Sequence, residues 1–376
     1  MPRKASVMII AGDPSGDHHA APVIQRLKQY NPDLTFWGIG GPAMTSQGFE
    51  AVMPFAPFNK MGFVEVARHL PFFLKAKNRI VRMMKDRRPD VVVCVDYPGF
   101  NMMILRETRK LEIPVVWYIA PMVWAWKRKR AEVLGSLASH IAVIFPFETK
   151  YFQPYGAPVS YVGNPLTESI RDDGLKCFPE RKFPKGPIEL AVVPGSRPQE
   201  IKHMLTPMLD AARLLKEEFP QLVVSVSKFS GLDGSLFDQV HQYKDFRIFP
   251  GPLRDQLKNS HIALVTSGTA SLETALLGIP QVIAYRTSAL THTIFKKLVK
   301  TPFIGLPNII ADSCVAPECI QDEAEPRVMA LKLQHLLSKP KYYKKAVDDL
   351  STLKQRLGDS SPSLNVAEII YSYLGK

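Results

Sequence analysis

The stretch LAVVPGSRPQEIKHM combines an apolar run with a Pro-Gly turn, a Ser-Arg pair and a second proline. Glycine permits a tight turn and proline suits the first turn of a helix, so Pro194, Gly195 and Pro198 mark a passage from strand to helix. Ser196 and Arg197 then fall where a helix presents unpaired N–H groups and the positive end of its dipole, a place that favours an anion. An arginine held there indicates a bound phosphate, although this stretch alone fits an exposed surface arginine equally well.

A second turn of this kind occurs in VTSGTASLETALLGIP, where Ser267, Gly268 and Thr269 follow another apolar run. The N–H groups of this turn can bind the oxygens of a second phosphate, and Glu273, about one helical turn later, can accept hydrogen bonds from both hydroxyls of a ribose. The two turns together predict a nucleoside-diphosphate site in the second half of the chain. The Walker lysine motif and the dinucleotide GxGxxG are missing from the sequence, which disfavours ATPase and NAD chemistry. No DxD pair is placed to hold a metal, so Arg197 and helix N-termini should neutralise the diphosphate.

In the first half, the segment AGDPSGDHHAA has the form of a capped turn from strand to helix. Ser15 and Asp17 can cap the helix that follows. His18 and His19 lack a third ligand at helical spacing, which disfavours a metal site. They remain weaker candidates for acid-base work.

The segment CVDYPGFN places Asp96 at the end of a strand that should lie centrally in the first domain. A carboxylate in this position is either a loop cap or a general base beside a cleft, and the local sequence supports both roles equally. Asn101, at the start of the next helix, is expected to be a cap.

Short β-branched runs that alternate with helical periods position all of these loops. The runs are VMIIA, LTFWG, DVVVCV, VVWYIA and HIAVIF, then LAVV, LVVSVS, IALVT and PQVIAY. Such alternation predicts an α/β protein with two doubly wound parallel sheets facing each other across a cleft. We expect a first domain over 1–170, a linker over 171–187, a second domain over 188–350 and a helical segment over 351–376. The last segment should dock on the first domain or on a partner subunit, which leaves a homodimer open.

The composition narrows the class of partner. The chain has 376 residues and a formal charge of +13, which suggests an anionic partner: nucleic acid, a membrane surface or a phosphorylated substrate. Aromatic residues near the basic runs lack an RNP-like pattern, which disfavours nucleic acid. The four cysteines form no CxxC pair, so reduced thiols in a cytoplasm are expected, without a zinc site. The longest apolar run, IPVVWYIAPMVWAW, is too short to span a bilayer.

The motifs AGDPSGD, VDYPGFN, APMVWAWKRKR, PFE, VGNPL, PGSR, SGTASLE and LPNIIAD occur in this order. With them the chain resembles the lipid-A-disaccharide synthase family essentially from end to end. The resemblance implies an inverting glycosyltransferase of the two-Rossmann (GT-B) type without a cofactor. It joins UDP-2,3-diacylglucosamine to 2,3-diacylglucosamine 1-phosphate through a β-1,6 bond and releases UDP.

The resemblance also implies roles for residues. Asp96 corresponds to the catalytic aspartate, Arg197 and the turn from Ser267 to Thr269 serve the UDP diphosphate, Glu273 serves the ribose, and Asn308 lies near the nucleotide. On the acceptor and lipid side the candidates are Ser15, Asp17, Phe72, Arg79, Arg82 and Trp124. The chain departs from the usual family pattern at Gly12-Asp13, at 120–126 and at Asn164. The alternatives are another GT-B UDP-N-acetylglucosamine transferase or epimerase, and a catalytically silent lipid-binding homologue.

The segment ARHLPFFLKAKNRIVRMMKDRRP predicts an amphipathic helix over 67–89. At 100° per residue its apolar stripe consists of Leu70, Phe73, Leu74, Ile80, Val81 and Met84. The basic residues Arg68, Lys75, Arg79 and Arg82 gather opposite, with Phe72 at their edge. We expect the stripe to pack in the core. The basic face, Phe72 and the preceding PFAPFNKMGF should dock the first domain on the anionic cytoplasmic leaflet of the inner membrane, as a peripheral protein.

Overall fold

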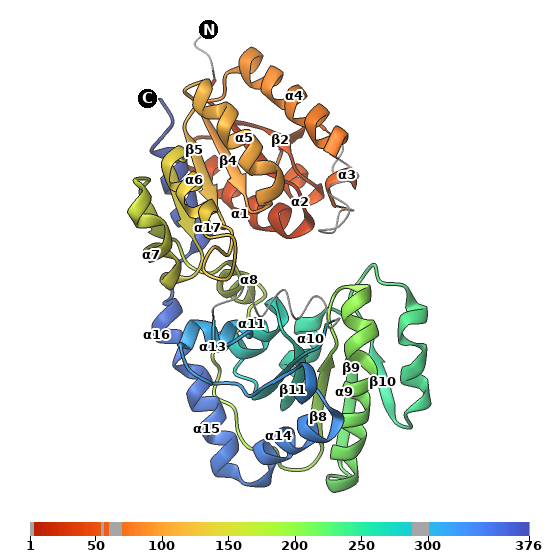
Figure 1. Ribbon diagram of the computed structural model, residues 1–376. Coiled ribbons are helices and arrows are strands. Elements are labelled where there is room, and N and C mark those ends of the chain that lie inside the picture. The colour runs from red at the N-terminus through yellow and green to blue at the C-terminus, as the bar shows by residue number, and fades with distance from the viewer. Residues whose placement is uncertain (1–3, 54–55, 60–69, 288–300, 376) are drawn as a thin grey trace. The chain divides into compact units, whose positions relative to one another are not determined.

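The computed structural model describes residues 4–53, 56–59, 70–287 and 301–375 and divides the chain into two compact units. Unit 1 consists of residues 1–168 and 359–376, and unit 2 consists of residues 169–358. Each unit is an α/β domain built on one parallel sheet (Figure 1).

The sheet of unit 1 has the strand order β3-β2-β1-β4-β5-β6-β7, with every neighbouring pair parallel. The order reverses between β1 and β4, and in doubly wound sheets ligands bind beyond the carboxyl ends of the strands at such a reversal. The strands are β1 (Ser6–Ala11), β2 (Thr35–Ile39), β3 (Glu50–Ala51), β4 (Val91–Val95), β5 (Val115–Tyr118), β6 (His140–Val143) and β7 (Val159–Tyr161).

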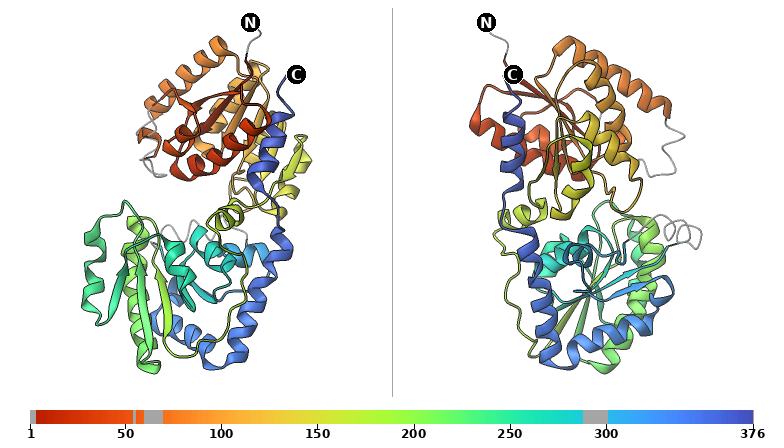
Figure 2. Two further views of the ribbon diagram at one scale, coloured as in Figure 1. Left: turned by 180° about the vertical axis from the view of Figure 1, so that it is seen from behind. Right: turned by 60° about the vertical axis from the view of Figure 1, so that its left-hand side comes forward.

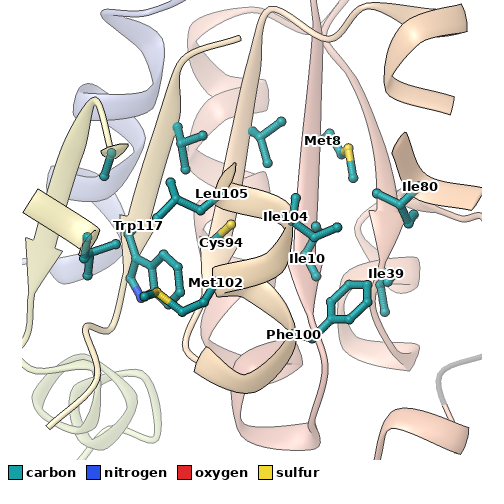
Figure 3. Close-up of a cluster of buried hydrophobic side chains, with 14 of the residues drawn as sticks. Met8, Ile10, Ile39, Ile80, Cys94, Phe100, Met102, Ile104, Leu105 and Trp117 are labelled. Carbon is teal, nitrogen blue, oxygen red and sulfur yellow. The ribbon is translucent and has the colours of Figure 1, made fainter. Parts of the chain in front are cut away.

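Helices cover both faces of this sheet. On one face Phe100, Ile104 and Leu105 of α5 lie over Ile10 and Cys94 of the central strands (Figure 3). The described helices of the unit are α1 (Pro14–Tyr30), α2 (Pro42–Ser46), α3 (Ala56–Asn59), α4 (Leu70–Arg87), α5 (Pro98–Lys110), α6 (Lys129–Leu137), α7 (Thr149–Phe152) and α17 (Pro362–Tyr371), and α8 (Pro165–Asp172) continues from unit 1 into unit 2. Because both faces are covered, the central strands β1 and β4 are buried at every residue.

The sheet of unit 2 repeats this design with the order β10-β9-β8-β11-β12-β13, again all parallel, and reverses between β8 and β11. Its strands are β8 (Ile188–Val193), β9 (Leu222–Ser227), β10 (Phe246–Phe249), β11 (Ile262–Thr266), β12 (Gln281–Tyr285) and β13 (Glu318–Ile320). Its helices are α9 (Pro198–Glu218), α10 (Leu253–Lys258), α11 (Thr269–Leu276), α13 (Leu306–Ala311), α14 (Pro326–Ser338), α15 (Pro340–Ser351) and α16 (Leu353–Leu357).

The segments around the boundaries are tied to specific units. In the segment 173–187, Arg181 donates from Nε to the carbonyl of Leu277 at 3.1 Å and from Nη1 to the carbonyl of Lys258 at 3.3 Å, so this segment lies along unit 2. After Gly358 the chain returns to unit 1, where α17 packs beside α1 (Figure 2). The last helix therefore docks on the first domain, one of the two placements expected from the sequence.

Candidate functional site

The helix that follows β1 is capped by a residue other than the two expected. Asp13, rather than Ser15 or Asp17, caps α1 by accepting a hydrogen bond from the Gly16 N–H at 2.7 Å. Ser15 is exposed in the first turn of the helix. The expectation that Ser15 and Asp17 cap this helix is therefore wrong, because the residue one position before the helix already has the required extended backbone and carboxylate.

Asp17 instead serves the GGPAM loop that follows β2. Its buried carboxylate accepts hydrogen bonds from the N–H groups of Gly41, Ala43 and Met44 at 2.8, 2.9 and 3.1 Å. These are the unpaired donors at the start of α2, so Asp17 caps a helix that begins 25 residues later in the chain. Asp17 thus fixes the second loop at the carboxyl edge of the sheet relative to the first.

The two histidines of the first loop differ in exposure. His18 is exposed, whereas His19 is half-buried. Burial, with a smaller contribution from His18, lowers the pKa of His19 to about 4. His19 is therefore neutral at pH 7 and a much weaker base than a group whose pKa lies near the working pH.

Asp96 lies directly after β4 in a left-handed backbone conformation, with φ of 43°, and Tyr97 follows with φ of 47°. The Tyr97 ring covers Gly12, where an added Cβ would lie 2.4 Å from the ring, so only glycine fits at that position. Tyr97 also donates from its hydroxyl to the carbonyl of Phe58 at 2.9 Å. Two consecutive residues in this sparsely populated region indicate a turn that its surroundings hold in place.

The side chain of Asn101 fixes this turn through hydrogen bonds. Its side-chain amide donates to the carbonyl of Asp96 at 2.8 Å, and to those of Val95 and Ile10 at 3.3 and 3.4 Å. Asn101 is completely buried inside α5 and is not the expected helix cap. It joins the ends of the two central strands β1 and β4, and thereby fixes the position of Asp96.

The environment of Asp96 changes its acidity. Burial, together with the negative charge of Asp13, raises the pKa of Asp96 to about 7, and a hydrogen bond from the Tyr97 backbone opposes the rise. A carboxylate with this pKa can accept a proton near neutral pH far more readily than an ordinary aspartate. Asp96 therefore has the acidity expected of a general base.

The loops after β5 and β6 meet at Trp124 and Glu148. Trp124 donates from Nε1 to Oε1 of Glu148 at 3.1 Å, and the N–H groups of Phe145 and Ile144 donate to Oε2 at 3.0 and 3.2 Å. Both side chains are buried, so Trp124 does not offer a lipid-facing surface as expected. Burial raises the pKa of Glu148 to about 8, and the charge of Asp96 adds to this.

In unit 2, Arg197 precedes α9 and its side chain is 79% exposed. It contacts Glu200 through an ion pair of 3.3 Å. The carboxylate of Glu200 also accepts the N–H groups of Ser196 and Arg197 at 2.9 and 3.2 Å. In the structure an acidic side chain thus occupies the helix donors that the sequence predicted for a phosphate, while the Arg197 guanidinium extends into solvent.

The second turn lies between β11 and α11. Gly268 has φ of 142°, which favours glycine, and an added Cβ would meet no atom within 4 Å. Ser267 donates from its hydroxyl to the carbonyl of Ile304 at 2.8 Å, and Thr269 begins the helix. The two expected phosphate loops therefore follow β8 and β11, the strands between which the sheet order reverses.

Glu273 is held by Arg254, which the sequence analysis did not single out. Arg254 donates from Nε to Oε1 of Glu273 at 2.8 Å, and its Nη2 lies 2.7 Å from the same oxygen. The structure assigns no hydrogen bond to Oε2 among the described residues.

Asn308 is completely buried, and its side chain is fully engaged within unit 2. Its Nδ2 donates to the carbonyl of Ala316 and to Oε1 of Glu318, both at 2.7 Å, and its Oδ1 accepts the N–H groups of Val315 and Ala316 at 2.8 Å. Asn308 braces the loop after α13, and its own polar atoms do not face solvent.

On α4, Phe73, Ala76, Ile80 and Met84 are buried, whereas Leu70 and Leu74 remain 49% and 44% exposed. The expectation that both leucines pack in the core is therefore wrong, because at 100° per residue they lie to one side of the stripe that is actually buried.

The basic and aromatic residues of α4 also differ in their contacts. Phe72 packs edge-on against Phe58, and Arg79 donates to the carbonyl of Val52 at 3.0 Å. Lys75 and Arg82 are exposed. Arg68 and most of PFAPFNKMGF lie outside the described residues.

The described part of the chain contains no group of three or more His, Cys, Asp or Glu side chains that could hold a metal ion. Among the described helices, none combines the length and apolar character required to cross a membrane.

Solved structures of low sequence identity share this architecture. A putative UDP-N-acetylglucosamine 2-epimerase from Listeria monocytogenes matches with a TM-score of 0.67 and 11% identity, over 98% of this chain and 96% of that one. The calicheamicin glycosyltransferase CalG4 matches with a TM-score of 0.59 and 12% identity, over 99% and 98%. These likenesses establish two Rossmann-like domains of the GT-B kind.

Sequence comparison is more specific. Residues 7–368 match the family described as lipid-A-disaccharide synthetase. The lipid-A-disaccharide synthase of Geobacter sulfurreducens is 34% identical over 98% of this chain and 97% of its own, and that of Syntrophus aciditrophicus is 36% identical over 94% and 93%. The chain therefore belongs to the lipid-A-disaccharide synthase family of glycosyltransferases.

Proposed function

We propose that the chain transfers 2,3-diacylglucosamine from UDP to the 6-hydroxyl of 2,3-diacylglucosamine 1-phosphate, with Asp96 as the general base. The observation that carries the proposal is the raised pKa of Asp96 at the point where the sheet order of unit 1 reverses. The Asp96 carboxylate accepts the proton of the 6-hydroxyl as its oxygen attacks the anomeric carbon of the donor. The bond between that carbon and the diphosphate oxygen breaks with its electron pair, UDP leaves from the opposite face, and the anomeric configuration inverts.

Unit 2 is assigned to the donor. Arg197 is the exposed cation nearest to the start of α9, so it neutralises the charge that develops on the departing UDP. The turn from Ser267 to Thr269 supplies N–H groups at the second loop, and Oε2 of Glu273 accepts ribose hydroxyls. Asn308 contributes by bracing the neighbouring loop. Unit 1, which carries Asp96, is assigned to the acceptor.

Lipid-A-disaccharide synthases from several bacteria match the chain at 32–36% identity, whereas the epimerases share only 11–15% and hence only the fold. A UDP-release assay tests the proposal with acylated and unacylated donors, each with and without the monosaccharide acceptor. Release should require both the acylated donor and the acceptor. Efficient turnover of an unacylated donor would instead favour an epimerase or another transferase.

The variant Asp96→Asn tests the assigned base. It should lower kcat by about 10²-fold or more, the loss typical of a removed base, with UDP affinity unchanged. Asp33→Asn is a matched control, because Asp33 is an exposed aspartate of the same unit that contacts Lys4. If Asp96→Asn and Asp33→Asn have the same kcat, another group is the base.

The substrates carry acyl chains, so the protein must meet a membrane surface. We propose that the start of α4 provides the contact with the cytoplasmic leaflet. Leu70 and Leu74 expose apolar surface, and Lys75 and Arg82 are exposed cations on the same helix. Apolar side chains beside cations are the combination that binds anionic interfaces.

A further inference from the structure

Among the described loops at the carboxyl edge of the unit 1 sheet, charge is distributed unevenly. The loops after β1, β4 and β6 carry the carboxylates Asp13, Asp96 and Glu148. The loop after β5 instead leads into the run WKRKR at residues 126–130. A concentrated positive charge thus lies at the same edge of the sheet as the proposed base.

The strand that leads to this basic run is hydrogen-bonded to Asp96. The N–H of Asp96 donates to the carbonyl of Tyr118, the last residue of β5, at 2.9 Å. Eleven residues later the chain enters α6, and between the two Trp124 donates a hydrogen bond to Glu148. Because neighbouring parallel strands lie only about 4.8 Å apart, the loops after β4 and β5 are neighbours.

Within the run, two cations share one aromatic ring. Nζ of Lys127 lies 4.5 Å from the centroid of the Trp126 ring, and Cζ of Arg130 lies 5.4 Å from it. Burial lowers the pKa of both side chains, and the charge of Arg130 lowers that of Lys127 further. Arg128 and Lys129 lie between them in sequence. Both are exposed, and neither contacts an aromatic ring among the described residues. The Trp126 indole thus holds the cationic side chains of Lys127 and Arg130 close together, where their positive charges repel one another.

The acceptor supplies the matching charge. Its amine and its 3-hydroxyl are acylated, so the 1-phosphate is its only ionised group, and a phosphate monoester carries about −1.5 to −2 charges at pH 7. We propose that Lys127 and Arg130, held on the Trp126 ring, bind the 1-phosphate of the acceptor and so orient its 6-hydroxyl toward Asp96. The inference rests on the proposed function, because it names the group by which unit 1 recognises that acceptor.

The test compares acceptors with and without the phosphate. Wild-type enzyme should show a lower KM for 2,3-diacylglucosamine 1-phosphate than for 2,3-diacylglucosamine. Lys127→Gln and Arg130→Gln should each raise KM for the phosphorylated acceptor about tenfold, the factor that 1.4 kcal/mol produces, while KM for the unphosphorylated acceptor stays unchanged. Lys127→Arg and Arg130→Lys should restore part of the loss. Arg128→Gln and Lys129→Gln, made singly, each remove the same formal charge from the same run without touching Trp126, and their kinetics should match wild type.

Other outcomes would overturn the inference. Equal KM increases for both acceptors would indicate a general disturbance of the loop, which a thermal melt of each variant would also reveal. Weaker UDP binding would assign the cluster to the donor, and loss of binding to phosphatidylglycerol vesicles at unchanged KM would assign it to membrane headgroups. If wild-type enzyme releases no UDP with either acceptor, the proposed function fails. If it turns over both acceptors with one KM, only the present inference fails.

Discussion

Arg254 joins Glu273 to the segment that begins unit 2. Its Nε donates to Oε1 of Glu273 at 2.8 Å, while its Nη1 donates to the carbonyl and the hydroxyl of Ser169 at 2.9 and 3.1 Å and also contacts Asp173. All of these residues belong to unit 2. Arg254 therefore holds Oε1 of Glu273, and the proposed ribose contact falls to Oε2.

We expect Arg254→Gln to weaken UDP binding through the ribose alone. The variant should lose UDP affinity, because Glu273 can rotate and its carboxylate loses its partner. Affinity for 2′,3′-dideoxy-UDP, which has no hydroxyl to bind, should be the same in the variant and in wild type. Isothermal titration with both nucleotides measures this difference. An equal loss for both would show that Arg254 acts on the fold of unit 2, or directly on the diphosphate.

Substitutions at Arg197 and at Glu200 should change the affinity for UDP in opposite directions. Arg197→Ala removes a charged donor and should weaken UDP binding by about 1.5–3 kcal/mol. Glu200→Gln keeps an oxygen that can accept the N–H groups of Ser196 and Arg197 but removes a negative charge beside the proposed diphosphate site, so it should tighten binding. Titration calorimetry at fixed salt compares the two. Weaker binding by Glu200→Gln would mean that its charge is needed to hold Arg197 in place.

The pH dependence of kcat/KM should follow the protonation of Asp96. Because the base must be deprotonated, kcat/KM should fall as pH drops through about 7, the pKa to which burial and Asp13 raise Asp96. Asp13→Asn removes the charge contribution but keeps an oxygen that can cap α1, so the acidic limb should move to lower pH while the contribution of burial remains. Asp33→Asn should leave the profile unchanged. An unmoved limb in Asp13→Asn would show that another group titrates.

We expect transfer to proceed without a divalent metal. The sequence has no DxD pair, and the described residues contain no cluster of three metal-ligand side chains. Activity should therefore survive EDTA and show no gain from Mg²⁺ or Mn²⁺ in the UDP-release assay. A strict requirement for either ion would redirect attention to carboxylates that have no role here.

The sequence predicted the elements better than the contacts between them. All nine apolar runs became strands, whereas β3, β7, β10 and β13 were missed because these edge strands of two to four residues are too short to give a clear pattern. The loops with Asp96, Arg197 and Ser267 were found because turn residues followed buried strands.

The partners of individual side chains were not predictable in this way. Asp17 and Asn101 look like caps of their own helices, but their partners are distant in sequence: Gly41 for one and Ile10 for the other. The same holds for Glu148 with Trp124 and for Arg254 with Glu273. Local propensity describes neighbours along the chain, and tertiary packing overrode it at each of these positions.

The structure changes how membrane binding should be tested. Phe72 packs against Phe58 and Arg79 holds the Val52 carbonyl, so replacing either would disturb unit 1 as well as its surface. Leu70 and Leu74 are about half exposed and can be changed without opening the core. Because fully burying a leucine contributes roughly 1.5–3 kcal/mol, each of these should contribute about 1 kcal/mol at a membrane.

We therefore expect Leu70→Ser/Leu74→Ser to reduce co-sedimentation with phosphatidylglycerol vesicles by more than tenfold while UDP binding is unchanged. Lys75→Gln/Arg82→Gln should remove about 1 kcal/mol per charge and most of the salt dependence of wild-type binding. Leu331→Ser is the matched control, because Leu331 is a leucine of unit 2 that is 62% exposed on α14. If Leu331→Ser releases the protein from vesicles as effectively as the α4 variants, or if the folded α4 variants bind like wild type, the start of α4 is not the docking surface.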